Sequence, residues 1–177
     1  MRQSRPPVCL AAYTVALLAA LPTQAQTSYE RYTDPEGQFT IMLPDGAEPS
    51  FEQPGALGEW RLPSGVAIWL ETHAVAPTED LTLYEQVVLD TVQGRLDDGW
   101  RLAGSSRLDD VALEGHGVEQ GLGVRLSNPI TSNAAVVVML EKGTTVYLLW
   151  VLMPPDVARD AKLGRVLSEV VSSLRVT

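Results

Sequence analysis

Hydrophobic and polar positions alternate with a period of two along much of the chain. The first clear example places Phe39, Ile41 and Leu43 on one side of a short stretch, a pattern typical of a strand with one buried face. The segment Asp34–Gly37 before it favours a turn, because its proline presets the φ angle of the second turn position. Pro44 cannot donate to a strand ladder and ends the stretch. These features predict an opening β-hairpin.

Further strands follow the same two-residue period. The stretches Gly58–Leu62 and Gly65–His73 are separated by Pro63-Ser64 and predict a second hairpin. Later segments predict four more strands, at 100–108, 117–127, 134–141 and 144–153, with a tight turn at Glu141–Thr144. The last two strands are apolar on both faces, which is typical of the centre of a covered sheet.

Two segments have the 3.6-residue period of amphipathic helices. The first begins in a capping box made by Thr82 and Glu85 and is expected at about 83–97. The second is expected at about 157–174, with Asp156 as its N-cap. Antiparallel strands with two separate amphipathic helices predict an α+β domain in which the helices pack on the sheet.

The N-terminal segment has the features of a secretory signal peptide. Arg2 and Arg5 form a short basic region, and an apolar run follows at Val8–Leu21. Small residues before position 26 offer a cleavage site. The apolar run is short for a bilayer span, and an uncleaved N-terminal anchor is the alternative. We therefore expect a cleaved signal at 1–25 and a periplasmic or secreted protein.

Residues 26–177 have the length of one domain with a sizeable hydrophobic core. The single cysteine, Cys9, lies in the expected signal, so this domain has no disulfide, thiolate metal ligand or thiol nucleophile. Without Arg2 and Arg5 it keeps 11 basic residues against 22 acidic ones, a net charge of −11. This charge disfavours nucleic acid and anionic membrane surfaces as partners.

Several short motifs occur in a characteristic order. The opening "YTDPEGQFTIMLP" joins a strand, a turn and a Phe-x-Ile-x-x-Pro element, and "LTLYEQ" begins the mid-chain helix. The segment "VALEGHGVEQ" is expected to be a glycine-containing hairpin. A hydrophobic strand ends in proline in "TTVYLLWVLMPP", and "SEVVSSLRV" closes the last helix. With these motifs the chain resembles the PsbP-like superfamily, which also includes the Mog1-like and DcrB-like proteins, as an exported bacterial member.

The resemblance implies a twisted antiparallel β-sheet flanked by two main α-helices. It also implies a binding or assembly role, because the superfamily includes photosystem subunits, a small-GTPase release factor and bacterial envelope proteins. These roles share no catalytic motif, so the resemblance supplies no catalytic residue. Some envelope relatives carry a lipid-bearing cysteine, whereas Cys9 precedes the apolar run and is badly placed for that role.

The two histidines, His73 and His116, are candidates for chemistry. A zinc site needs three or four ligands, and neither histidine has a second one at helical spacing. We expect His73 near Glu71, and His116 near Glu114 and Glu119. Each is interpreted as a surface histidine at the end of a strand, with a weak carboxylate-assisted metal site as the alternative.

The glycine-rich stretch Gly115–Gly123 has some features of a phosphate-binding loop. Such a loop needs a helix after it, but the strand-like sequence "VRLS" follows, and the loop contains no lysine. We interpret it as a hairpin or edge strand. No Gly-x-Ser-x-Gly elbow occurs, and acidic pairs such as Asp109-Asp110 are typical of solvated turns. We therefore expect no catalytic residue, no metal site and no cofactor.

The four tryptophans all lie on predicted strands, where most are interpreted as core residues. Trp60 and Trp69 share the predicted second hairpin and are a possible exposed aromatic binding face, with His73 at the end of the same hairpin.

The sequence predicts a non-enzymatic binding or assembly module of the cell envelope, with a protein as its partner. One alternative is a small-ligand carrier, with an apolar pocket between sheet and helix rimmed by His73 or arginine side chains. A small hydrolase is the other alternative, and it requires His116 and nearby carboxylates to converge in one cleft.

Overall fold

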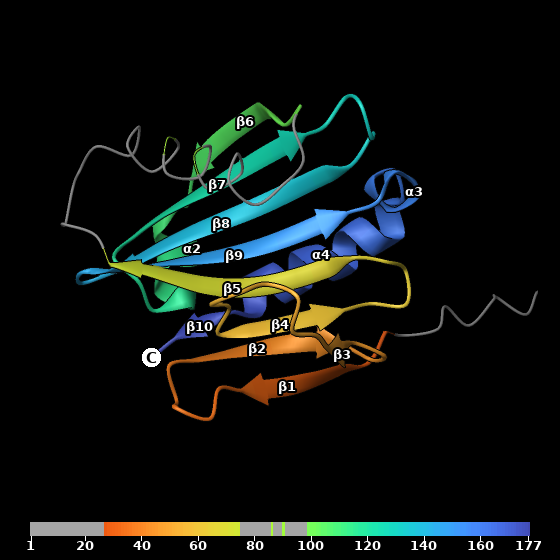
Figure 1. Ribbon diagram of the computed structural model, residues 1–177. Coiled ribbons are helices and arrows are strands. Elements are labelled where there is room, and N and C mark those ends of the chain that lie inside the picture. The colour runs from red at the N-terminus through yellow and green to blue at the C-terminus, as the bar shows by residue number, and fades with distance from the viewer. Residues whose placement is uncertain (1–26, 75–85, 87–89, 91–98) are drawn as a thin grey trace, which may run out of the picture.

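The computed structural model describes residues 27–74, 86, 90 and 99–177. The larger of its two antiparallel sheets contains β3 (Glu48–Pro49), β4 (Gly58–Arg61), β5 (Ala67–Ala74), β6 (Arg101–Arg107), β7 (Gln120–Ser127), β8 (Ala134–Lys142) and β9 (Thr145–Met153). These seven strands lie in the order β3-β4-β5-β9-β8-β7-β6 (Figure 1). The smaller sheet contains β1 (Tyr29–Thr33), β2 (Phe39–Pro44) and β10 (Arg175–Val176), in the order β1-β2-β10.

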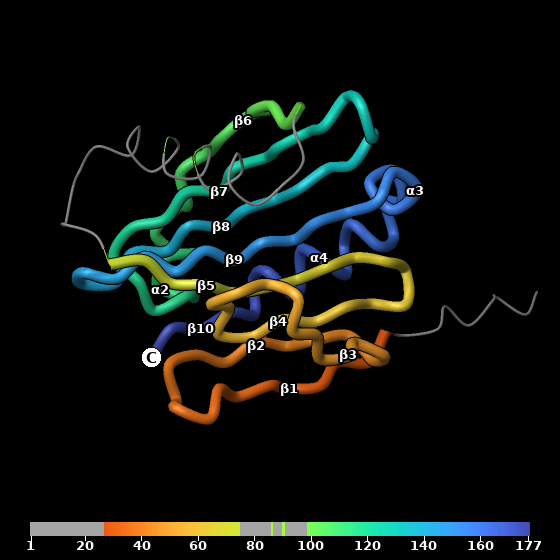
Figure 2. The backbone as a smooth tube through the Cα atoms, in the orientation of Figure 1, coloured from red at the N-terminus to blue at the C-terminus, as the bar shows by residue number. Residues whose placement is uncertain are grey.

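The predicted opening hairpin is confirmed. β1 and β2 pair antiparallel, from Tyr29 opposite Pro44 to Thr33 opposite Thr40. The Asp34 side chain holds the turn, because its Oδ2 accepts the backbone N–H groups of Glu36 and Gln38, each at 3.1 Å. β10 pairs with the other edge of β2, so β2 lies between the first and the last strand of the described chain (Figure 2).

The second predicted hairpin is also confirmed, and so is the predicted pair of strands on either side of the turn at Glu141–Thr144. β4 pairs with β5, and β8 pairs with β9 through a tight turn in which Gly143 has a φ of 60°. β9 lies between β8 and β5, which places the most apolar strand of the chain at the centre of the sheet. Its six residues from Val146 to Val151 are all buried, as a strand covered on both faces requires.

One face of the large sheet, here called the helical face, packs against α4 (Ala161–Ser173) and β2 (Figure 1). The helix buries Leu167 and Val170 there, and each such side chain contributes about 1.5–3 kcal/mol through removal of apolar surface from water. The Ser173 hydroxyl accepts the backbone N–H of Met42 at 2.8 Å and so joins the end of the helix to β2. The smaller sheet is thereby fixed against the larger one.

The other face of the large sheet, here called the opposite face, holds a second buried cluster. Its largest members are Trp69 and Trp150, whose rings stack at 5.3 Å with an interplanar angle of 6°. The indole Nε1 of Trp150 donates to Oε1 of Glu71 at 2.9 Å, and only 1% of Glu71 is exposed. Without this hydrogen bond, the buried donor and the buried acceptor would each be unsatisfied, at a cost of about 1–3 kcal/mol in stability.

The prediction of a single closing helix at about 157–174 is wrong in detail. The segment forms two helices, α3 (Pro155–Ala158) and then α4. Asp156 lies in the first turn of α3, and Pro154 occupies its N-cap position. Asp160 starts the second helix because its carboxylate accepts the N–H groups of Lys162 and Leu163, and this cap breaks the helical run.

The hairpin expected at "VALEGHGVEQ" is wrong. Asp110–His116 form a short helix, α2, and Gln120 then begins β7. The Asp109 carboxylate accepts the N–H of Ala112 at 2.9 Å and so caps the helix. Gly117 ends it with a φ of 73°, a left-handed conformation that glycine adopts without strain. The acidic pair interpreted as a solvated turn is therefore a helix N-terminus.

The helix predicted at about 83–97 lies outside the described residues except for Gln86 and Asp90. Both are helical, and Gln86 Nε2 donates to Asp90 Oδ1 at 2.7 Å. The predicted signal at 1–25 also lies outside the described part of the chain. Within that part, no helix is long and apolar enough to cross a membrane.

His116 is buried, and its titration should make stability depend on pH. Its Nδ1 donates to the carbonyl oxygen of Leu174 at 2.8 Å, and burial lowers the pKa of His116 below its ordinary value of 6.5. Below about pH 6.5 the unfolded chain therefore binds a proton that the folded chain does not, so stability falls as pH falls. We expect a loss of up to about 1.4 kcal/mol per pH unit in this range.

The measurement is urea unfolding at pH 7.5, 6.0 and 5.0, with His116→Asn as the comparison. The asparagine amide keeps a donor at the position of Nδ1 but does not titrate. The variant should lose less stability than the wild type on acidification, and equal losses would show that His116 does not carry the effect.

Candidate functional site

The two tryptophans predicted to form a shared exposed surface do not form one. Trp60 is 3% exposed and Trp69 is 1% exposed. In the β4–β5 register Trp60 lies opposite Ile68, whereas Trp69 lies opposite Glu59. Since neighbouring positions of a strand point to opposite faces, Trp60 packs on the helical face and Trp69 on the opposite face. Both are core residues.

His73 lies on the same face of β5 as Trp69 and Glu71. Its Nε2 is 3.5 Å from Oε1 of Glu71, which confirms the predicted proximity. His73 therefore ends a short polar series that starts at Trp150 and passes through the Glu71 carboxylate. Among residues 27–74 and 99–177, no three His, Cys, Asp or Glu side chains are grouped as a metal site would need.

His116 and its neighbouring carboxylates do not converge. The His116 ring is directed to the backbone of Leu174, and it is buried at the end of α2, not exposed at a strand end as predicted. The Glu119 carboxylate accepts the backbone N–H of Gly143 at 3.2 Å. These contacts serve the packing of turns and helix ends, and the cleft that the hydrolase alternative requires is not formed by these residues.

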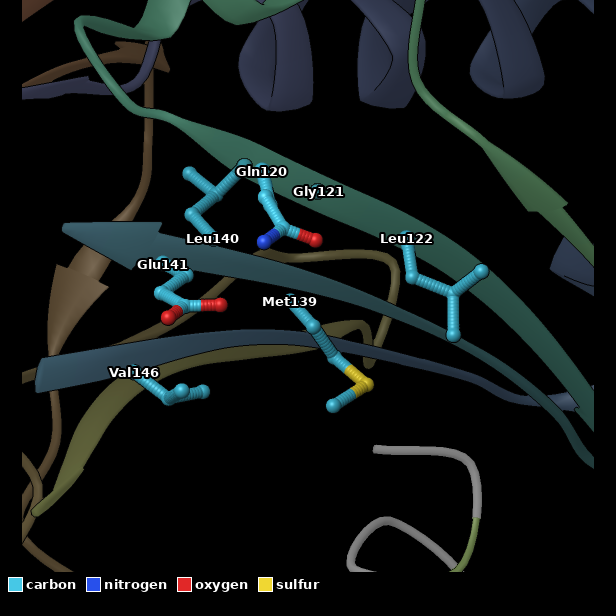
Figure 3. A pocket seen from close by; sticks show the side chains of 7 residues that line it. All are labelled: Gln120, Gly121, Leu122, Met139, Leu140, Glu141 and Val146. Atoms are coloured by element: carbon cyan, nitrogen blue, oxygen red, sulfur yellow. The ribbon is translucent and has the colours of Figure 1, made fainter. Parts of the chain in front are cut away.

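A small pocket lies on the opposite face between β7, β8 and β9 (Figure 3). Gln120 and Glu141 supply its polar atoms, and Leu122, Met139 and Val146 supply apolar walls. Its volume is about 10 Å³, which is about the space of one water molecule. This pocket is therefore too small for a substrate or a cofactor.

A larger cleft lies at the edge of the large sheet, beside the loop between β3 and β4. Its volume is about 350 Å³. Most of its lining is aromatic or apolar, with one buried carboxylate. The lining residues are Tyr32, Pro49, Ser50, Phe51, Gln53, Ala56, Leu57, Gly58, Glu59 and Trp60. We call it the aromatic cleft.

The rigid side of the aromatic cleft comes from the two hairpins. The ring of Tyr32 meets the Trp60 indole edge-on at 5.0 Å, and Phe39 meets the same indole at 6.5 Å. Gly58 makes room for this indole, because a Cβ atom at that position would lie 2.4 Å from the ring. The two sheets therefore meet through one aromatic cluster, and the cleft lies along that junction.

The other side of the cleft is formed by the loop between β3 and β4, which is held by several hydrogen bonds. The N–H groups of Ser50 and Leu57 donate to backbone carbonyls at 2.9 and 2.7 Å. The Gln53 N–H donates to Oε2 of Glu59 at 2.7 Å. Within this loop Phe51 is 95% exposed. The fold therefore presents a large aromatic side chain to solvent beside an aromatic cleft.

A second cleft of about 220 Å³ adjoins the first between the two sheets. Tyr32, Pro49 and Trp60 line both. The two clefts therefore adjoin along the junction between the sheets, and the second also borders Arg31 and Asp45.

An apolar groove of about 360 Å³ follows α4 on the helical face. Val136, Val151 and Met153 line it from the sheet, and Arg125 of β7 lies opposite Val136 in the strand register. The helix contributes Gly164, Leu167, Ser168, Val171 and Ser172. This is the kind of pocket that the carrier alternative requires, except that His73 belongs to the opposite face and does not rim it.

Sequence reasoning found Trp60 but missed the residues that make it part of a site. Tyr32 and Glu59 were assigned to strands without a role, and Phe51 lies in a segment with no periodic pattern. A lone phenylalanine between Pro and Gly residues is the one available signal for Phe51. The contact between the Tyr32 and Trp60 rings depends on packing between two hairpins, so no local sequence pattern predicts it.

The fold and its site can now be compared with known proteins. No family model matches the sequence, and no curated protein matches it. The solved structure of cyanobacterial PsbP (CyanoP) from Synechocystis sp. PCC 6803 is similar, with a TM-score of 0.59 and 16% identity over 90% of this chain and 99% of that one. The Ran-binding protein Mog1p of Saccharomyces cerevisiae is also similar, with a TM-score of 0.56 and 11% identity over 85% and 96%.

These similarities identify the fold. The antiparallel sheets with packed helices are those of these two α+β structures, which confirms the predicted fold class and the predicted likeness in fold to PsbP and Mog1. At this level of identity the comparison shows a shared fold, and function has to be argued from the site itself.

The two aromatic residues of the cleft should differ sharply in their effect on stability. Trp60→Ala removes a core side chain and should cost about 3–5 kcal/mol in the free energy of unfolding. Phe51→Ser changes a side chain that is 95% exposed and should change it by no more than about 0.5 kcal/mol. Urea unfolding monitored by circular dichroism measures both, and a comparable loss in the two variants would contradict this placement.

Proposed function

We propose that this chain is a non-enzymatic protein-binding module and that the aromatic cleft is its contact face. The observation that carries the proposal is Phe51, a 95% exposed aromatic side chain held beside a cleft of about 350 Å³. Aromatic side chains are enriched among the few residues that dominate binding energy at interfaces, and this one borders a cleft that Tyr32 and Trp60 also line.

The arrangement suits a protein partner better than a small molecule. Phe51 projects from a loop and gains by burial under a second surface, whereas Tyr32 and Trp60 offer a firm wall into which a partner side chain can pack. The cleft is open and continues into the adjoining one through shared residues. A structural relative of similar fold, Mog1p, is described as a Ran-binding protein, which supports the use of this fold for protein recognition.

The proposed location is the periplasm or the extracellular space, after removal of residues 1–25. The basic, apolar and small-residue regions of the N-terminal segment support this proposal. The partner is then a protein of the cell envelope. An acidic domain of net charge −11 suits a basic surface on that partner.

A small-ligand carrier is the second candidate, supported by the groove beside α4. Its lining is mainly apolar, and its volume of about 360 Å³ falls within the range of small-molecule sites. The two candidates use different surfaces, so they can be separated by mutation.

The protein-binding proposal predicts a partner whose capture depends on Phe51. Protein produced from the full coding sequence is immobilised and exposed to an envelope extract from its own host, and retained proteins are identified by mass spectrometry. Phe51→Ser should reduce capture of one reproducible partner at least tenfold, the usual loss at a central aromatic contact.

Val111→Ser is the matched control, because Val111 is also an exposed apolar residue, at 80%, but lies on α2. It should leave capture unchanged. A partner captured equally by Phe51→Ser contradicts the choice of this face. Retention of a small molecule without any protein favours the carrier, and loss of that molecule in Gly164→Leu, which fills the groove, would assign it to the α4 groove.

The proposed export predicts a defined N-terminus. Protein recovered from the host should begin at Gln26, as measured by intact mass and by sequencing of its N-terminal peptide. Replacing Ala25 with tyrosine should preserve the precursor, because the cleavage site needs small residues. A wild-type protein that retains residues 1–25 would favour the anchor alternative.

A further inference from the structure

The apolar groove beside α4 has a positively charged border on the side away from the helix. In the strand register, Val136 of the groove floor lies opposite Arg125 of β7, and Arg125 lies opposite Gly104 of β6. Paired positions on neighbouring strands point to the same face of a sheet. Val136 packs against the core cluster of the helical face, so Arg125 belongs to that face too. The floor of the groove therefore continues into a basic side chain.

The Arg125 guanidinium lies over β6, where a glycine makes room for it. Its Nη2 is 3.0 Å from the position that a Cβ atom of Gly104 would occupy, and the Arg125 side chain is exposed to solvent. Neighbouring strands are about 4.8 Å apart, so the guanidinium lies about 10 Å across the sheet from the groove floor at Val136. A ligand that contacts both must be extended.

Arg101 brings a second positive charge to the same face. It lies opposite Ser127, which is two residues from Arg125 along β7. β6 and β7 contain no acidic residue, and neither arginine forms an ion pair within residues 27–74 and 99–177. Like charges on one border repel each other, and an anion bound there relieves that repulsion.

The groove itself suits a single apolar chain. Its volume of about 360 Å³ lies near the lower end of the range for small-molecule sites. Gly164 of α4 lines it and faces open space, because a Cβ atom there would have no neighbour within 4 Å. A glycine inside a helix is destabilising relative to alanine, and here no packing contact requires one. Its missing side chain instead keeps the groove open.

We propose that the α4 groove and its arginine border bind an anionic amphiphile, a single apolar chain that ends in a carboxylate. The chain packs on Val136, Val151 and Met153 beside α4, and the carboxylate accepts hydrogen bonds from the Arg125 guanidinium, with Arg101 adding to the positive potential. A guanidinium suits this role because its planar fork of donors matches the two carboxylate oxygens. This inference goes beyond the proposed protein-binding function and states the ligand class for the second candidate, the carrier.

The first test varies the head group and the chain length. Decanoate, 1-decanol and butyrate are titrated at neutral pH into 15N-labelled protein from the full coding sequence, with the amide signals of Gly104, Val136 and Gly164 as reporters. Decanoate should shift all three signals. Decanol should bind at least about threefold more weakly, because it lacks the charge-assisted hydrogen bond at this exposed border. Butyrate should bind more weakly still, because it is too short to reach both parts of the site.

Two results of this titration overturn the inference. One is the absence of decanoate binding at these signals. The other is binding of decanol or butyrate as tight as that of decanoate, since the site requires both the charge and the chain.

The second test removes the charge of Arg125. Arg125→Gln should abolish the preference for decanoate over decanol and leave the melting temperature unchanged, because the side chain is exposed. Arg107→Gln is the matched control, since Arg107 is exposed on the same edge strand but lies opposite Leu122 of the opposite-face cluster. It should keep the preference. A preference that survives Arg125→Gln, or is lost equally in both variants, contradicts a specific site at Arg125.

The third test separates this site from the aromatic cleft. Gly164→Leu should abolish decanoate binding by filling the groove, whereas Phe51→Ser should leave it unchanged, and binding that survives Gly164→Leu contradicts the placement of the chain. The titration and the capture experiment fail independently. A partner captured through Phe51 without any decanoate preference leaves protein binding standing and removes the amphiphile site. A decanoate preference that depends on Arg125, with no captured protein, leaves the amphiphile site standing and contradicts protein binding.

Discussion

The structure depends on a central sheet whose middle strands are buried on both faces. In β5 and β9, Trp69 and Trp150 stack on the opposite face, while Ile68 and Leu149 belong to the cluster on the helical face. Because side chains alternate along a strand, a shift of one residue would exchange the two sets and send Glu71 into the wrong environment. The packing of two different cores therefore determines a single register, and every other element is placed relative to it.

The candidate site lies where the large sheet ends, beside β3 and β4. The central strands β5 and β9 are buried over most of their length, and the space left beside them is the groove along α4. At that edge, β4 directs Trp60 towards the smaller sheet, where it meets Tyr32 and Phe39. The hydrogen-bonded loop that carries Phe51 completes the cleft. A rigid aromatic wall with an exposed residue on a neighbouring loop is a common way to build a recognition site.

Much of the fold was predictable from local patterns. The two hairpins and the strands β6, β7, β8 and β9 followed from the two-residue period and from turn residues, and they lie close to their predicted bounds. The errors concern short helices and the two-residue strands β3 and β10, which were not predicted. The seven residues of α2 are too few for a clear helical period, and Asp109 and Gly117 act as caps that also occur in turns. The last predicted helix is two helices, because Asp160 caps the start of α4. Hydrophobic periodicity alone does not reveal such a cap.

The sequence by itself determined the longer strands, the turns that join their hairpins, and that the domain has a large core, because these properties depend mainly on each residue and its near neighbours. The tertiary structure decided which residues meet. It separated Trp60 from Trp69, brought His116 to Leu174, and placed Tyr32 and Glu59 at one cleft. Such contacts depend on strand register and on packing between distant segments, and their free energy appears only when the whole chain has folded.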